Sequence, residues 1–136
     1  MKWLTGLLVI AAGCLGGCAS ADPDPSSEVS VVKMTSGLKY DTADLTITAG
    51  QTVEWKNVAI MMHTVTADPS LAKKADDVAL PPGAKPFNSG DIRPGKSFQY
   101  TFTVPGAYKY FCIPHESSGM VGTITVKLAA TTGPAE

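Results

Sequence analysis

The segment from Tyr110 to Gly122 carries three side chains that could bind a metal ion. Cys112 offers a thiol, His115 an imidazole and Met120 a thioether. These groups bind metals through sulfur or nitrogen, and a loop that carries all three could present them to one ion. The residue types and their spacing therefore indicate metal binding.

A second imidazole is available from His63, because the chain has only two histidines. His63 lies between the segment that contains Val53 and Trp55 and the strand-like residues 64–66. From that position a neighbouring strand could carry the ring to the loop of Cys112. We therefore assign His63 as the fourth ligand.

The donor set favours copper over zinc. A thiolate stabilises Cu(I), imidazole suits both Cu(I) and Cu(II), and a weak axial thioether completes a geometry that both states accept. Zinc sites use four strong nitrogen or sulfur ligands, or three and a water, and neither kind normally uses methionine. The sequence thus predicts one Cu(I)/Cu(II) site, with the ligands His63, Cys112, His115 and Met120.

Each ligand assignment has a plain alternative. A lone cysteine is usually a small buried hydrophobe, a methionine usually fills the core, and a lone histidine is usually an ordinary surface or core residue. Met61 and Met62 also lie beside His63, which leaves the source of the thioether open. The combination favours the metal site, because the only thiol of the predicted domain and the only two histidines form one ligand set at loop spacing.

Short apolar and β-branched runs, separated by Gly and Pro, surround these residues. Several alternate with a period of two, so that Phe98, Tyr100 and Phe102 share one face, as do Ile124, Val126 and Leu128. Regularly spaced short strands predict an all-β sandwich or barrel. The predicted strands are Val29–Met34, Asp44–Thr48, Thr52–Lys56, Thr64–Ala67, Ser97–Thr103, Ala107–Cys112 and Gly122–Leu128.

One stretch, residues 68–90, shows no strand pattern. It contains four prolines and mixed charges, and it predicts a surface excursion with a short helical turn around residues 71–78. We expect its charged side chains to face solvent.

The N-terminus predicts export. Lys2 followed by the apolar run 4–15 resembles a signal peptide and is too short to span a bilayer. Residues 1–18 are the predicted signal peptide, either of the lipoprotein type with lipid on Cys18 or cleaved after Ala21. A flexible tether (19–27), one domain (28–128) and a frayed tail (129–136) complete the predicted organisation, which places the protein in the periplasm or on the outer face of a bacterial membrane.

Composition limits the function further. The 136 residues suffice for one domain, and a net charge of −1 makes nucleic acid an unfavourable partner. Two of the three cysteines, Cys14 and Cys18, belong to the signal region, so the domain keeps one thiol and no internal disulfide.

The pattern Cys112-x-Pro114-His115-x4-Met120, with His63 upstream and a closing Gly-Met-Val-Gly, resembles the plastocyanin-like branch of the type 1 blue copper proteins, the cupredoxins. The resemblance implies a Greek-key β-sandwich with copper at one end and one-electron transfer between larger redox proteins. It also implies that Cys112 dominates the electronic coupling, that His63 and His115 are equatorial ligands and that His115 is the exposed edge for electron exit.

The sequence departs from that family at two positions. Members often have Asn directly after the first histidine, where it ties the two ligand loops together, and here a hydroxyl at Thr64 could make part of that bond. Plastocyanins of photosynthesis carry an outward-facing Tyr before the cysteine, whereas this chain has Phe111. With no evident acidic patch, a photosynthetic role is not supported.

We therefore expect a monomeric electron carrier and not an enzyme, because no spare imidazole exists for a second metal or a base. An apolar patch of Met61, Met62, Ile113 and Pro114 would dock a cytochrome or copper oxidoreductase briefly. The methionines could instead fill the core. Copper delivery or storage is the alternative function, and a sandwich that has lost its metal is a third.

Overall fold

The computed structural model describes residues 27–131. The predicted signal peptide, nearly all of the tether and the last five residues of the predicted tail lie outside the described residues. Among the described residues, no helix is long and apolar enough to cross a membrane.

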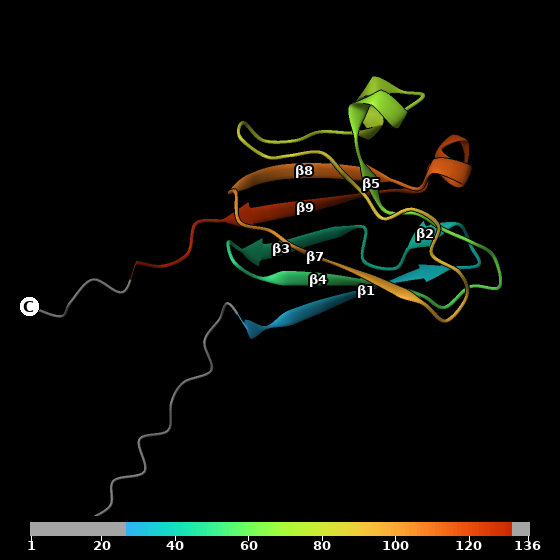
Figure 1. Ribbon diagram of the computed structural model, residues 1–136, viewed down its shortest axis with the longest axis horizontal. Coiled ribbons are helices and arrows are strands. Elements are labelled where there is room, and N and C mark those ends of the chain that lie inside the picture. Colours follow the sequence, from blue (N-terminus) through green and yellow to red (C-terminus); the bar gives the residue numbers. More distant parts are fainter. Residues whose placement is uncertain (1–26, 132–136) are drawn as a thin grey trace, which may run out of the picture.

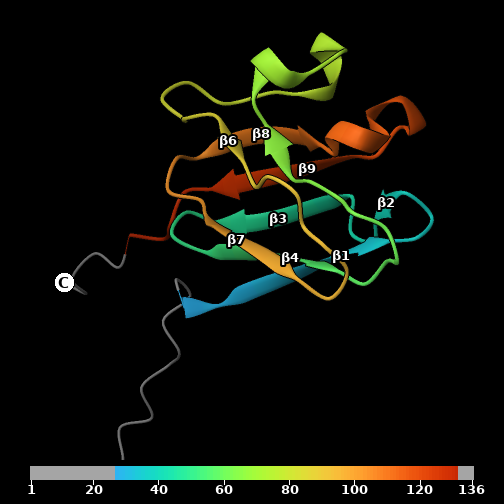
Figure 2. The same cartoon turned by 45° about the vertical axis from the view of Figure 1, so that its right-hand side comes forward.

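Two sheets stack face to face, as Figures 1 and 2 show. The first sheet has the order β2-β1-β4-β7, and the second has the order β3-β9-β8-β5-β6. The strands of the first sheet are β1 (Val29–Thr35), β2 (Lys39–Tyr40), β4 (Thr52–Asn57) and β7 (Ser97–Thr101). Those of the second are β3 (Asp44–Thr48), β5 (Thr66–Ala67), β6 (Phe87–Asn88), β8 (Gly106–Phe111) and β9 (Val121–Lys127). The predicted β-sandwich is confirmed.

Alternating side chains fill the space between the sheets. In β4 the residues Val53 and Trp55 are fully buried, while Lys56 between Trp55 and Asn57 faces solvent. The Trp55 ring meets Tyr110 of β8 edge-on, with ring centroids 5.3 Å apart. Full burial of a large apolar side chain contributes about 1.5–3 kcal/mol relative to exposure. The two sheets are thus held together by the faces that the period-two pattern predicts.

The face shared by Phe98, Tyr100 and Phe102 is confirmed, since Phe102 is fully buried and the other two are half-buried. The prediction that Leu128 shares the face of Ile124 and Val126 is wrong. β9 ends at Lys127, and Leu128 is 79% exposed because no partner strand continues beside it.

Two predicted strands have other bounds in the structure, because backbone groups at one end of each bond elsewhere: the first is two residues shorter, and the second is shifted by one residue. The strand predicted from Thr64 begins only at Thr66, since the N–H of Thr64 donates to Cys112 Sγ and that of Val65 to Ser89 Oγ. The strand predicted to end at Cys112 ends at Phe111, because the Cys112 N–H donates to the Met120 carbonyl.

The connection between β5 and β6 (residues 68–86) is the predicted excursion, and it lies above β8 in Figure 1. It contains two 3-10 turns, η2 (Pro69–Leu71) and η3 (Ala75–Asp77), where a helical turn was expected. The prediction of no strand up to residue 90 is wrong, because Phe87–Asn88 pairs with β5. The strand β2 was also missed. Both β2 and β6 are only two residues long, which is too short to show an alternation of apolar and polar residues.

Candidate metal centre

The loop after β8 is a distorted 3-10 segment, η4 (Ile113–Ser118), with Pro114 in its first turn. Three backbone bonds close it: His115 N–H to the Cys112 carbonyl (3.1 Å), Met120 N–H to the His115 carbonyl (3.3 Å) and Cys112 N–H to the Met120 carbonyl (3.0 Å). Gly119 ends the segment with φ of 75°, a left-handed conformation that favours glycine. The loop therefore brings its three candidate ligands together through its own backbone.

His63 reaches the same end of the sandwich from the connection between β4 and β5. Its N–H donates to the Ile92 carbonyl (3.2 Å) and its carbonyl accepts from the Ile92 N–H (2.8 Å). Asn57, fully buried, fixes the turn before it by donating to the carbonyls of Met61 and Ile92 and accepting from the Ala59 N–H, each at 2.8 Å. The backbone of His63 is thus held by Ile92, and the turn that leads to it is held by Asn57.

Three donor atoms converge at this end. The Nδ1 atoms of His63 and His115 are 3.2 Å apart, and Cys112 Sγ lies 3.7 Å from the first and 3.4 Å from the second. A point equidistant from all three lies about 2 Å from each, which is the length of a bond from a metal to imidazole nitrogen or thiolate sulfur. The three side chains therefore fit one metal ion without rearrangement.

Burial shifts the pKa of two of these groups, His63 and Cys112. Burial, and then the neighbouring His115, lowers the pKa of His63. Burial raises the pKa of the Cys112 thiol, and the N–H of Thr64, which donates to Sγ at 3.3 Å, partly offsets this. A neutral His63 suits metal binding, whereas the thiol must release its proton when a metal binds.

Met120, the predicted fourth ligand, is fully buried and belongs to the same buried cluster as Cys112. The alternatives lie differently: Met61 is half-buried and Met62 is 41% exposed. Their exposure makes them poorer candidates for an axial ligand within the protein than Met120.

Thr64 joins the two segments that carry the candidate ligands. Its hydroxyl oxygen accepts from the Ile113 N–H at 2.8 Å and lies 3.1 Å from the hydroxyl of Thr66. Its carbonyl accepts from the Tyr40 hydroxyl at 2.8 Å. The expectation that a hydroxyl makes part of the bond between the loops is met.

Two residues at the site were not singled out from the sequence. Asn57 comes directly after the strand predicted to end at Lys56, and Glu116 lies in the loop between the predicted ligands His115 and Met120. Glu116 is only 2% exposed, and its carboxylate accepts from the backbone N–H groups of Lys73 and Lys74. No local pattern could have found it, because its partners lie more than forty positions away.

Apolar side chains lie exposed on the segments that carry the histidines. Pro114 and Met62 are exposed, Ile113 and Met61 are half-buried, and His115 itself is half-buried. The sequence interpretation overlooked Ile60, which is 86% exposed. Phe111, at the position of the family's outward-facing Tyr, is fully buried.

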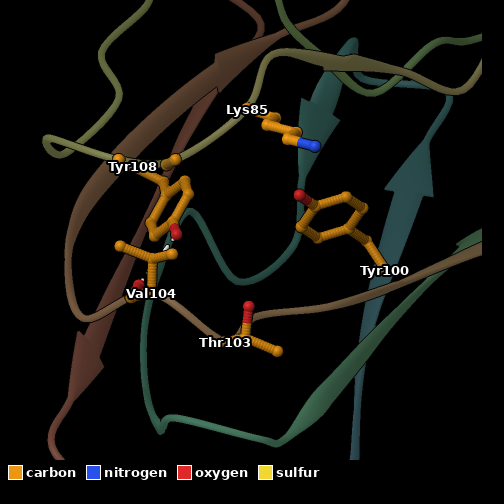
Figure 3. Close-up of a pocket in the computed structure, with 7 residues that line it drawn as sticks. Lys85, Tyr100, Thr103, Val104 and Tyr108 are labelled. Atoms are coloured by element: carbon orange, nitrogen blue, oxygen red, sulfur yellow. Dashed lines mark hydrogen bonds between the residues drawn. The ribbon is translucent and has the colours of Figure 1, made fainter.

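A cleft of about 290 Å³ lies at the start of β8, the end of that strand remote from Cys112 (Figure 3). Lys85 points toward Tyr100 across it, and Tyr108 forms another wall, with its hydroxyl bonded to the Val104 carbonyl at 2.8 Å. None of the predicted ligands lines this cleft, so it is separate from the metal centre.

The model of the copper-binding proteins of the plastocyanin/azurin family matches residues 27–127. Plastocyanin of Prochlorothrix hollandica is 34% identical over 123 residues, which cover 89% of this chain and 88% of that protein. The chloroplastic plastocyanin of Oryza sativa subsp. indica is 34% identical over 118 residues, 87% of this chain and 71% of that protein.

Solved structures of amicyanin variants are also similar to this chain. An oxidised amicyanin variant with leucine in place of a methionine has a TM-score of 0.56 at 28% identity, over 72% of this chain and 81% of that one. A reduced amicyanin variant with phenylalanine in place of a proline has a TM-score of 0.57 at 27% identity, over 73% and 82% of the two chains. The sandwich, the converging His63, Cys112 and His115, and these matches together show that the chain belongs to the plastocyanin/azurin family of copper-binding proteins, whose cofactor is copper.

Proposed function

We propose that the protein is a one-electron carrier with a single type 1 copper held by His63, Cys112, His115 and Met120. The observation that carries the proposal is the convergence of one cysteine sulfur and two imidazole nitrogens within 3.7 Å of one another in a β-sandwich of this family. Trigonal His₂Cys donors with a weak axial methionine are typical of electron-transfer copper sites. Copper bound there would supply the Cu(I)/Cu(II) couple.

The chain's own residues would keep the site in one shape. Asn57 fixes the turn before His63, and the hydroxyl of Thr64 fixes the start of the loop with His115. The Thr64 N–H bond to Cys112 Sγ stabilises a thiolate. Donor groups that do not move between oxidation states make electron transfer fast, because little reorganisation accompanies it.

A carrier role is favoured over an enzymatic one by the count of imidazoles. Both histidines belong to the proposed copper site, which leaves none for a second metal or for a general base. We propose that the protein has no catalytic centre of its own.

Redox partners would dock at the end of the sandwich where His115 reaches the surface. Met62, Ile60 and Pro114 supply exposed apolar area there or on the neighbouring segment before His63. Brief redox encounters use small interfaces, and such a patch suits a cytochrome or copper oxidoreductase. We propose that the carrier works as a monomer.

The domain, residues 28–128, would act outside the cytoplasm. The apolar run near the N-terminus and the Cys18 box support export, with the domain tethered by lipid at Cys18 or released by cleavage after Ala21. Lipid incorporation in the wild type and its loss in Cys18→Ala would support the anchored form, and incorporation that persists would contradict it.

Spectroelectrochemistry of the copper-loaded protein tests the carrier role. We expect the visible band to bleach on reduction and to return on oxidation over repeated cycles, with the copper retained in the presence of a Cu(I) chelator. Loss of copper to the chelator on each reduction would instead support the delivery function that an exposed Met62 beside His63 favours.

A further inference from the structure

Glu116 is a buried carboxylate between two candidate ligands. It lies between His115 and Met120 and is 2% exposed. Its Oε1 accepts from the N–H groups of Lys73 (2.8 Å) and Lys74 (2.9 Å), and its Oε2 accepts from that of Lys73 (3.0 Å). The carboxylate of the ligand loop therefore binds the backbone of the β5–β6 connection.

The contact uses backbone groups and not the lysine ammonium groups. Lys73 and Lys74 are exposed, and the short bonds all run from their backbone nitrogens. Hydrogen bonds to an ionised acceptor are about twice as strong as neutral ones. Burying a carboxylate charge costs free energy unless hydrogen bonds compensate for the lost water. The three bonds from Lys73 and Lys74 supply that compensation.

The same residue also shapes the ligand loop. The carbonyl of Glu116 accepts from the Gly119 N–H at 2.9 Å, which closes the last turn before Met120. Its neighbour His115 has φ of −121° and ψ of 15°, outside helical geometry, so the loop bends between the two residues. Side chain and backbone of Glu116 thus connect the bend to the β5–β6 connection.

That connection is fixed at a second point on the sandwich. Ala79 forms a two-bond bridge with Lys109 of β8 (3.1 and 2.9 Å). In Figures 1 and 2 the two 3-10 turns of the connection lie beside η4 above the second sheet. The connection is therefore bonded to β8 at Ala79 and to the ligand loop at Glu116.

We propose that Glu116 is a positioning residue that holds the copper-ligand loop in its binding geometry by anchoring it to the backbone of the β5–β6 connection at Lys73 and Lys74. The inference rests on the proposed ligand set. In this proposal the β5–β6 connection carries none of the ligands but slows the dissociation of copper. Detaching the loop would let His115 leave the metal more often.

The test uses the full domain loaded with Cu(I), in wild type and in Glu116→Gln, which keeps the size of the side chain but has one acceptor oxygen and no charge. We measure the hydrogen exchange of the Lys73 and Lys74 amides by NMR and the rate of Cu(I) transfer to a chelator. Outer-shell changes typically cost 10–100-fold in metal affinity, so we expect both rates to rise about tenfold. Glu116→Asp, which retains the charge but is one methylene shorter, should fall between the two proteins.

Two matched controls separate the anchor from general loosening. The double variant Lys73→Ala/Lys74→Ala removes the ammonium groups and leaves the backbone donors. Asp68→Ala breaks the bonds to Ser70 (2.7 and 2.9 Å) within the same connection without touching the loop. Both should release copper within twofold of the wild-type rate.

The proposal is overturned if Glu116→Gln releases copper at the wild-type rate, or if Asp68→Ala accelerates release as much as Glu116→Gln. The ligand set is judged separately, because its failure would show as a wild-type protein without the intense visible band when oxidised. Variants that keep the band and still release copper faster support the anchor alone.

Discussion

The hydroxyl oxygen of Thr64 accepts a hydrogen bond of 2.8 Å from the backbone N–H of Ile113. The two residues follow His63 and Cys112 directly, and 48 positions separate Thr64 from Cys112, whose Sγ accepts from the Thr64 N–H. One threonine therefore ties together the two segments that supply the metal donors and also contacts the sulfur itself.

Replacing Thr64 with valine should weaken this connection at nearly constant volume. The half-buried Ile113 N–H would lose its acceptor, which we expect to cost about 1 kcal/mol, the lower end of the range for a fully buried donor. We expect the free energy of unfolding of the metal-free protein to fall by that amount in urea titrations. Thr64→Ser keeps the hydroxyl and should lose less than half as much; an equal loss would show that the methyl group, and not the bond, matters.

Asn57 should be important for stability although it is not a ligand. It makes three bonds of 2.8 Å to the turn before His63, and alanine would leave the Ala59 N–H and two carbonyls without those partners. We expect Asn57→Ala to destabilise the metal-free protein by about 3 kcal/mol, within the range for broken buried networks. A change below about 1 kcal/mol would mean that water replaces the amide at no cost.

The stability of the metal-free protein should fall on both sides of neutral pH. The pKa of His63 is lowered from 6.5, so as the pH falls the unfolded chain binds a proton first and the folded state loses stability. The pKa of Cys112 is raised from 9.0, so as the pH rises the unfolded chain loses its proton first and stability again declines. Urea titrations with chelator and reductant from pH 5 to 10 would measure this.

Each effect has its own control. His63→Gln should flatten the acid side of the profile, and Cys112→Ala should flatten the alkaline side. If the variants keep the slopes of the wild type, other groups set the pH dependence.

A charge on the apolar surface near the site should slow electron exchange without changing the copper site. Met62 is 41% exposed next to His63, and a lysine there would repel its counterpart in a second molecule and disfavour apolar contact. We expect Met62→Lys to lower the electron self-exchange rate, measured by NMR line broadening in mixed oxidation states, at least tenfold. Leu128→Lys, with 79% exposure just after β9 ends, is the matched control and should exchange at the wild-type rate.

Much of the fold could be predicted from local pattern. The faces of β4 and β7 follow the alternation of Val53 with Trp55 and of Phe98 with Tyr100, because burial on one face of a strand has a period of two. The loop with Cys112, His115 and Met120 could be found because all three lie within nine positions. His63 followed because it is the only histidine besides His115.

The remainder depends on contacts between distant segments. The strand from Thr64 was predicted too long because nothing local shows that the Thr64 N–H donates to Cys112 Sγ. Glu116 carries the charge of a surface residue, and only its distant bonds to Lys73 and Lys74 explain its burial. The burial and hydrogen bonds of such residues are determined by tertiary packing, which leaves no periodic signal in the sequence.

The central claim is that His63, Cys112, His115 and Met120 hold one type 1 copper, and Cu(II) titration of the purified metal-free domain tests it most directly. We expect an intense blue absorption band that saturates at one copper per chain and is lost in Cys112→Ser, whereas Met62→Leu keeps it. A wild-type protein that binds Cu(II) without such a band, or a Cys112→Ser variant that retains it, would contradict the account.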